Sequence, residues 1–275
     1  MALHLSLEHL TAWGLAPLEF IDLAADLGCE AVSLFVLAPM PSEPAPAFVE
    51  DRGLLRACRQ RLDDRGVRLN ALEVFPLAQD TRVADFEAGL EAGAELGGRM
   101  ATVIVFDPDR ARVIDRLGAF AELARRFGIV ANVEFIARSE LRSLPDAISL
   151  VRAVGAPGLG IVVDSLHWTR SGGTAAQLAA LDPALLGHVQ FCDGPAQMAL
   201  ELQLEHEGFR QRRIPGEGEF ALADFVGALP GGRLIGVEVP LADLARRGVP
   251  IQERARRAVA GARQVLEREG YDRQG

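Results

Sequence analysis

Four oxygen-bearing side chains each stand near the end of a short apolar run, where a buried strand would meet a loop. They are Glu134 in NVEF, Asp164 in VVDSLHW, Gln190 in HVQFCD and Glu238 in VEVP. A charged side chain is costly to bury after such a run unless it is paired or binds a metal. Three carboxylates brought together would also repel one another without a cation. We therefore predict that these four side chains bind one divalent metal ion, rather than acting separately as loop caps or ion-pair partners.

The donor atoms of this set indicate which metal it prefers. Three carboxylates and one amide offer only oxygen ligands, and oxygen ligands suit hard cations. We expect one divalent ion per chain, Mn²⁺ or Mg²⁺ in preference, with Co²⁺ or Zn²⁺ as alternatives. Water or substrate oxygens would complete the coordination.

Two histidines lie close in sequence to the predicted ligands. His167 follows Asp164 by three residues, so it is a candidate general acid or base, or a residue that holds a carboxylate ligand. The alternative is a histidine in a surface loop. His188 precedes Gln190 by two residues and shares its strand face, one layer deeper in the fold. We assign His188 to substrate binding, with a packed or supporting role as the alternative.

An arginine and a further glutamate are weaker candidates. Arg212 precedes the segment PGEGEF and is a candidate to bind a hydroxyl or carboxylate of the substrate. A solvated surface arginine is the alternative. Glu73, near the end of another apolar run, would face the opposite wall of the pocket.

The composition excludes several mechanisms and partners. The chain has no lysine, since all 29 basic residues are arginine, and this excludes Schiff-base, pyridoxal-phosphate and lysine-bearing P-loop chemistry. The net charge of −9, without a basic stripe, argues against nucleic acid. No apolar run is long enough to cross a membrane, and we expect neither a signal peptide nor a membrane partner. Three scattered cysteines form no disulfide framework, so we expect a cytoplasmic protein.

The residues that carry this chemistry must be positioned by a regular alternation of strands and helices. We predict strands at 3–7, 31–36, 67–75, 100–106, 129–135, 158–164, 187–191 and 233–239. We predict helices at 17–28, 54–66, 84–98, 110–128, 144–154 and 251–269. Eight such units favour a closed parallel barrel, and continuous apolar strands are typical of buried parallel sheets. We therefore expect one α/β domain over 1–275, a single (β/α)8 TIM barrel, with the reactive groups where strands end.

At these residues the chain resembles the xylose-isomerase-like TIM-barrel family, also called sugar phosphate isomerases and epimerases. The resemblance covers the whole chain and is strongest from 129 to 240. The family's metal ligands, its histidine after the aspartate and its loop arginine match Glu134, Asp164, Glu238, His167 and Arg212 in this sequence. Where the family often has HxH, this chain has His188-Val189-Gln190, which is similar to barrel-type 3-dehydroshikimate dehydratases. Resemblance to the histidine-rich endonuclease IV branch is poorer.

This resemblance implies enolisation next to a carbonyl of a small polyhydroxy carbonyl substrate. Glu134 and Glu238, or His167, would move the proton. An isomerase or epimerase of a sugar or cyclic polyol ketone is the first hypothesis, and a dehydratase of the 3-dehydroshikimate type is the second. A non-catalytic barrel that binds a metabolite or a partner subunit is the third. Whether the chain forms a homo-oligomer is left open.

Overall fold

Eight parallel strands close into a barrel in the computed structural model, which describes residues 3–38, 45–198 and 204–271. Closure is complete because β1 pairs with β8 as well as with β2. The strands are β1 (Leu5–Glu8), β2 (Ala31–Phe35), β3 (Arg68–Leu77), β4 (Met100–Val105), β5 (Val130–Glu134), β6 (Gly160–Asp164), β7 (Leu186–Phe191) and β8 (Ile235–Val237). This arrangement confirms the predicted TIM barrel, and each predicted strand overlaps an observed one.

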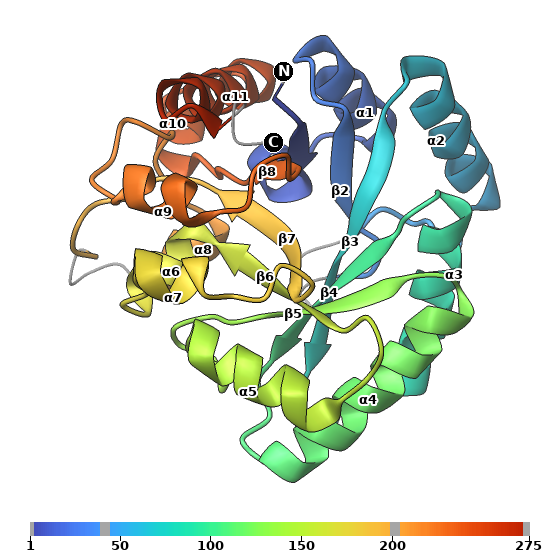
Figure 1. Ribbon diagram of the computed structural model, residues 1–275. Coiled ribbons are helices and arrows are strands. Elements are labelled where there is room, and N and C mark those ends of the chain that lie inside the picture. Colours follow the sequence, from blue (N-terminus) through green and yellow to red (C-terminus); the bar gives the residue numbers. More distant parts are fainter. Residues whose placement is uncertain (1–2, 39–44, 199–203, 272–275) are drawn as a thin grey trace.

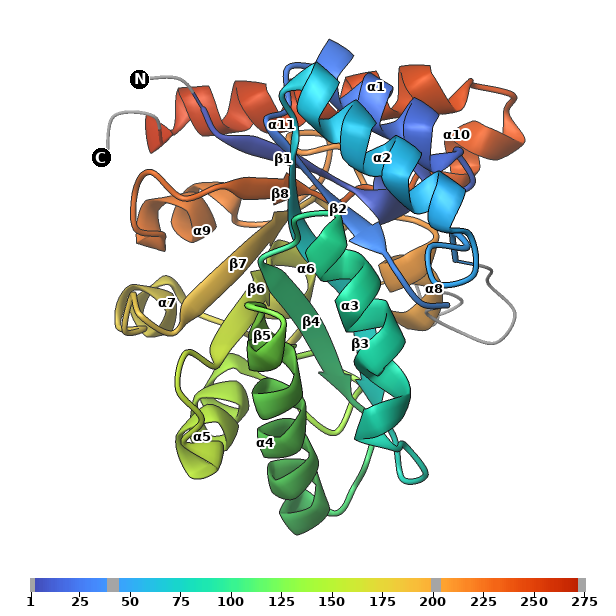
Figure 2. The ribbon, with the colours of Figure 1, turned by 90° about the vertical axis from the view of Figure 1, so that its right-hand side faces the viewer.

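Helices surround the strands on the outside of the barrel (Figure 1 and Figure 2). The longer ones are α1 (Pro17–Asp26), α2 (Arg52–Arg65), α3 (Glu87–Glu95), α4 (Arg110–Arg126), α5 (Leu144–Val154) and α11 (Ile251–Arg268). The shorter ones are α6 (Ser165–Arg170), α7 (Ala175–Ala179), α8 (Leu204–Phe209), α9 (Leu222–Ala228) and α10 (Ala242–Arg246), with 3₁₀ turns η1 (His9–Ala12) and η2 (Val83–Phe86). No helix among the described residues is both long and apolar enough to cross a membrane.

Local sequence signals set where these helices begin and end. The Ser143 side chain accepts from the amide of Asp146 at the start of α5, and Gly155 ends that helix with a φ of 64°. A hydroxyl on the residue that precedes a helix accepts a hydrogen bond from an amide of the first turn, which has no partner within the helix. Glycine adopts the left-handed conformation without the cost that a Cβ would impose.

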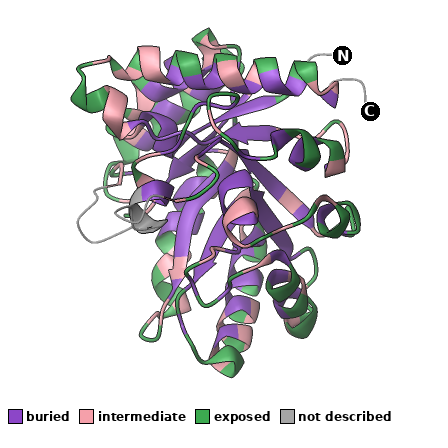
Figure 3. Ribbon diagram, turned by 90° about the vertical axis from the view of Figure 1, so that its left-hand side faces the viewer, coloured by how far each residue is buried: buried purple, intermediate pink, exposed green. Residues whose placement is uncertain are grey.

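The core lies both inside the barrel and between the strands and helices, and Figure 3 shows the strands as almost wholly buried. Between β3, η2 and α4, Phe75 and Phe120 pack with ring centroids 5.0 Å apart, and Phe86 completes the group. Full burial of each such side chain contributes about 1.5–3 kcal/mol to folding. This packing holds the strands in a fixed register, and that register positions the site.

Candidate functional site

The four predicted metal ligands gather at the carboxyl ends of neighbouring strands. Glu134 and Asp164 are the last residues of β5 and β6, Gln190 lies in β7, and Glu238 directly follows β8. Asp164 pairs in register with Gln190, and Gln190 pairs with Gly236. Because side chains alternate along a strand, these residues point into the barrel together. All four are buried, with at most 6% of their surface exposed.

Gln190 meets the requirement of a neutral oxygen ligand. Its Nε2 donates to Glu238 Oε1 at 3.2 Å, which fixes the orientation of the amide. Its Oε1 is buried and has no hydrogen-bond partner among the described residues. Buried polar atoms without a partner are rare in folded proteins, and an unrecorded ion or water is a common reason. The amide oxygen therefore fits a metal site, while the ligand role of Gln190 remains a prediction.

Arg212 occupies the centre of this carboxylate group. Its Nη1 lies 2.7 Å from Asp164 Oδ2, and its Nη2 lies 2.7 Å from Glu238 Oε2. Its Nε donates to the carbonyl oxygen of Gly208 in α8 at 3.1 Å. The side chain is buried, so it is not the surface arginine that was the alternative. A planar guanidinium that bridges two carboxylates offsets part of their mutual repulsion.

His167 is placed by the same aspartate that is a predicted ligand. Asp164 Oδ1 accepts from the amide of Leu166 at 2.7 Å and so caps the start of α6. His167 then lies on the first turn of α6, with Nε2 3.7 Å from Glu134 Oε1. One ligand atom each from Glu134, Asp164 and His167 lies within 4.8 Å of the other two. His167, three residues after Asp164 in the sequence, therefore lies inside the site, next to Glu134.

Burial and mutual repulsion shift the protonation of these groups. Burial lowers the pKa of His167 to about 4, so its imidazole is neutral near pH 7. Burial raises the pKa of Glu238 to about 8 against the opposing effect of Arg212. Burial, followed by the charges of Asp164 and Glu238, raises the pKa of Glu134 well above its usual value. A divalent cation would reverse the shifts of the carboxylates, because it favours their ionised forms.

His188 lies in a second buried cluster rather than beside Gln190 Oε1. Its Nε2 is 3.4 Å from Glu8 Oε2, and its Nδ1 is 3.2 Å from the Asn70 amide nitrogen. Glu73 joins the cluster from β3, and burial, followed by the charge of Glu8, raises the pKa of Glu73. The assignment of His188 to substrate binding remains a prediction. Glu8 was not predicted from the sequence, although this glutamate directly follows the apolar run LHLSL, which is typical of a strand.

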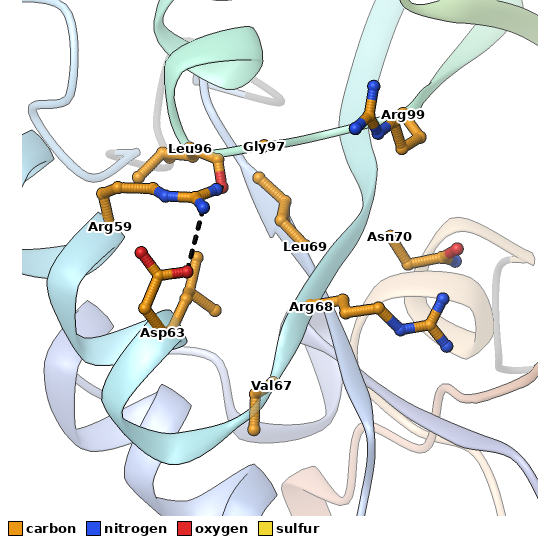
Figure 4. Close-up of a pocket in the computed structure, with 10 residues that line it drawn as sticks. Arg59, Asp63, Val67, Arg68, Leu69, Asn70, Leu96, Gly97 and Arg99 are labelled. Atoms are coloured by element: carbon orange, nitrogen blue, oxygen red, sulfur yellow. Dashed lines mark hydrogen bonds and ion pairs between the residues drawn. The ribbon is translucent and has the colours of Figure 1, made fainter.

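A cavity of about 330 Å³ opens at the opposite end of the barrel, where β3 and β4 begin. Figure 4 shows Arg59, Arg68 and Arg99 around it, with Arg59 bonded to Asp63 at 2.9 Å. None of the predicted catalytic or metal-binding residues lines it. This cavity is therefore separate from the carboxylate group at the strand ends.

The sequence pattern of the xylose isomerase-like TIM barrel family matches residues 21–265. The chain belongs to this family. A search among curated proteins finds no match. The family assignment agrees with the resemblance seen in the strand-end residues, but it does not address the glutamine at position 190.

Proteins of known structure share the fold at low sequence identity. The IolI protein, solved with a binding zinc atom, has a TM-score of 0.81 and 16% identity, over 97% of this chain and 99% of that chain. D-psicose 3-epimerase, solved in the presence of D-fructose, has a TM-score of 0.70 and 18% identity, over 96% of this chain and 99% of that chain. D-allulose 3-epimerase from Methylomonas sp. in complex with D-allulose has a TM-score of 0.71 and 16% identity, over 97% of each chain. These likenesses concern the fold.

Proposed function

We propose that this chain is a divalent-metal-dependent isomerase or epimerase that acts on a sugar or cyclic polyol ketone through an enediolate. The observation that carries the proposal is the convergence of three carboxylates and an amide oxygen at the carboxyl ends of β5 to β8, an oxygen with no hydrogen-bond partner in the part of the chain that the structure describes. In TIM-barrel enzymes the active site lies at this end. The family and the epimerases that share the fold support the same class of reaction.

The proposed metal ligands have a defined chemical task. Glu134, Asp164, Gln190 and Glu238 would hold one ion, with Mn²⁺ or Mg²⁺ preferred because every donor is oxygen. Zn²⁺ and Co²⁺ are the alternatives, and zinc is present in the structure of the IolI protein. When bound, the metal would polarise the substrate carbonyl and stabilise the negative charge that develops on its oxygen.

Two carboxylates supply the proton transfers in this proposal. Glu134 lies beside His167, whereas Glu238 is held by Gln190 and Arg212. One carboxylate takes the proton from the carbon next to the carbonyl, and the C–H electron pair forms the enediolate. Return of a proton to the neighbouring carbon gives isomerisation, and return to the opposite face of the same carbon gives epimerisation. His167, neutral near pH 7, can accept a proton at Nε2 or pass one from a substrate hydroxyl.

The contacts of Arg212 bear on the choice between a neutral and an anionic substrate. Both of its Nη atoms already contact carboxylates of the protein. A dehydratase of a keto acid needs an arginine for the substrate carboxylate, and Arg212 is already engaged. This favours an uncharged polyol ketone. The dehydratase remains the second candidate because the glutamine at position 190 is similar to what we expect of barrel-type 3-dehydroshikimate dehydratases.

A substrate panel tests the proposal. The protein is freed of metal with chelator, reloaded with Mn²⁺, Mg²⁺, Co²⁺ or Zn²⁺, and incubated with D-fructose, D-allulose, an inosose or 3-dehydroshikimate. We expect metal-dependent interconversion of a ketose or inosose, with solvent deuterium appearing at the carbon next to the carbonyl. Formation of an unsaturated acid from 3-dehydroshikimate alone would instead establish the dehydratase. Stoichiometric metal without turnover of any compound would support a binding barrel.

A further inference from the structure

A second group of metal-ligating side chains lies inside the barrel, apart from the four strand-end residues. Glu8 comes from the end of β1, Glu73 from β3 and His188 from β7. One ligand atom from each lies within 4.8 Å of the other two. Each side chain is almost fully enclosed, with at most 2% of its surface exposed. Three strands far apart in the sequence therefore aim donor atoms at one point.

Two of the three side chains in this cluster, Glu8 and His188, have buried polar atoms without hydrogen-bond partners among the described residues, whereas Glu73 accepts from the Thr102 hydroxyl at 3.4 Å. Neither carboxylate oxygen of Glu8 has a hydrogen-bond partner among the described residues, and Nε2 of His188 has none either. The two side chains approach to 3.4 Å without forming a hydrogen bond. Burying a carboxylate without compensating bonds costs several kcal/mol, so such groups are normally paired or bind a cation.

The surrounding residues leave room for Glu8 and orient His188. A Cβ on Gly236 would lie 2.4 Å from Glu8 Oε1, so the side chain of Glu8 reaches across β8 because that residue is glycine. Asn70 contacts Nδ1 of His188 at 3.2 Å. The Asn70 atom at this distance is Nδ2, which donates to Nδ1. Metal binding at Nε2 therefore requires the Asn70 amide to turn by about 180°, so that its oxygen accepts the hydrogen on Nδ1 and leaves the lone pair of Nε2 for the ion. Orientation of a histidine ligand through its other nitrogen is a regular feature of metal sites.

We propose that Glu8, Glu73 and His188 bind a second divalent cation within the barrel. Two carboxylates and a neutral imidazole carry a charge of −2, which one such ion balances. A mixed set of oxygen and nitrogen donors suits Zn²⁺, Co²⁺ or Mn²⁺ better than Mg²⁺. None of its residues is a predicted ligand of the first metal, so the two ions can be tested separately, although His188 is also the residue predicted to bind substrate.

Metal stoichiometry tests this proposal directly. Protein stripped with chelator is reloaded with Mn²⁺ or Zn²⁺, freed of excess ion, and analysed by elemental analysis and native mass spectrometry. We expect two ions per wild-type chain, one in Glu8→Gln and one in Glu134→Gln. Glu30→Gln is the matched control, because Glu30 is a partly exposed glutamate outside the barrel cluster that pairs with His4 and Arg68, and this variant should retain two ions.

The pattern of loss separates this site from the proposed catalytic metal. One ion in the wild type that is lost in Glu134→Gln but kept in Glu8→Gln would overturn the second site and leave the proposed function intact. One ion with the reverse pattern would support the second site and contradict the catalytic metal. Absence of bound ion in the wild type would overturn both. If Glu8→Gln does not fold by circular dichroism, Glu73→Gln is analysed in its place, with the same expectations.

Discussion

At the scale of single residues, Gln190 stands where the resemblance to the family leads us to expect a histidine. Its amide nitrogen donates to Glu238, and its oxygen has no hydrogen-bond partner within the described ranges of the chain. An amide oxygen is a hard, neutral ligand, whereas an imidazole nitrogen is softer. We predict that Gln190→His folds normally, shifts metal preference toward zinc and lowers turnover with Mn²⁺ or Mg²⁺. Metal content and turnover of the two proteins are compared after identical loading.

The matched control for that substitution is Gln177→His, because Gln177 lies outside the site in the capping box of α7. It should leave the metal profile as in the wild type. If Gln190→His also kept that profile, Gln190 would not be a ligand. The centre would then consist of three carboxylates, with the glutamine contacting the substrate.

His167 provides the second prediction at this scale. Its Nε2 lies near Glu134, and its Nδ1 is buried without a hydrogen-bond partner among the described residues. We predict that His167→Asn keeps its metal content but loses about 10²-fold or more in turnover, the scale of a lost general acid or base. Single-turnover rates and metal analysis are measured on the same samples. Unchanged turnover would reduce His167 to a structural residue.

At the scale of elements, the loop between β4 and α4 is held by one buried carboxylate. Nε and Nη2 of Arg112 donate to the two carboxylate oxygens of Asp107, both at 2.6 Å. Nη1 of Arg116 lies 3.1 Å from Asp107 Oδ2. Arg116 in turn donates to the carbonyl oxygen of Ala78 at 2.6 Å. This network ties the start of α4 to the segment that follows β3. The network follows the carboxyl end of β4, which pairs with β5, but none of its residues is a predicted catalytic or metal-binding residue.

We predict that Asp107→Asn lowers the Tm at pH 7. The hydrogen bond from Arg112 lowers the pKa of Asp107 to about 2, from an ordinary value of 3.8. A lowered pKa in the folded state stabilises the fold above the unfolded value, and that contribution is lost as the pH falls through the folded value. The difference in Tm between the variant and the wild type should therefore shrink between pH 4 and pH 2. A difference independent of pH would contradict this account.

The elements also show what sequence patterns can predict. Runs such as GLGIVVD indicated both the strand and the polar residue that ends it, because buried parallel strands are apolar until they reach the mouth of the barrel. The short helices α6 to α10 were not predicted. Each is only five to seven residues long, so its apolar residues do not repeat often enough to indicate a helix.

Contacts between distant elements were beyond sequence reasoning. Arg212 meets Asp164 and Glu238 because α8 and its following segment return over the barrel. Glu8 reaches His188 because Gly236, on a third strand, leaves the necessary space. A single sequence does not show which residues from distant elements come into contact. The types of residue at the strand ends could thus be predicted, but not which of them pair with one another.

At the scale of the whole molecule, the barrel concentrates acidic groups in its least hydrated region. Burial raises the pKa of Glu134 and Glu73, and it raises that of Glu238 to about 8. A carboxyl whose pKa is higher in the folded state gives its full stabilising contribution below its unfolded value near 4.5. That contribution is lost as the pH rises through the folded value. Metal-free protein should therefore lose stability between about pH 4.5 and pH 8.

The last prediction follows from the opposite effect of a bound cation. A divalent ion favours the ionised carboxylates, so the rise in Tm on adding metal should be larger at pH 8 than at pH 5.5. Ion at about 100 times its Kd stabilises a fold by about 2.7 kcal/mol, which corresponds to roughly 5–10 °C for a chain of this size. Arg212 partly balances Asp164 and Glu238, so the metal-free protein should still fold. Thermal melts with chelator and with Mn²⁺, at both pH values, measure the effect. In Glu238→Gln the rise in Tm on adding metal should depend less on pH than in the wild type. An equal rise at both pH values in the wild type would show that these carboxylates do not bind the ion.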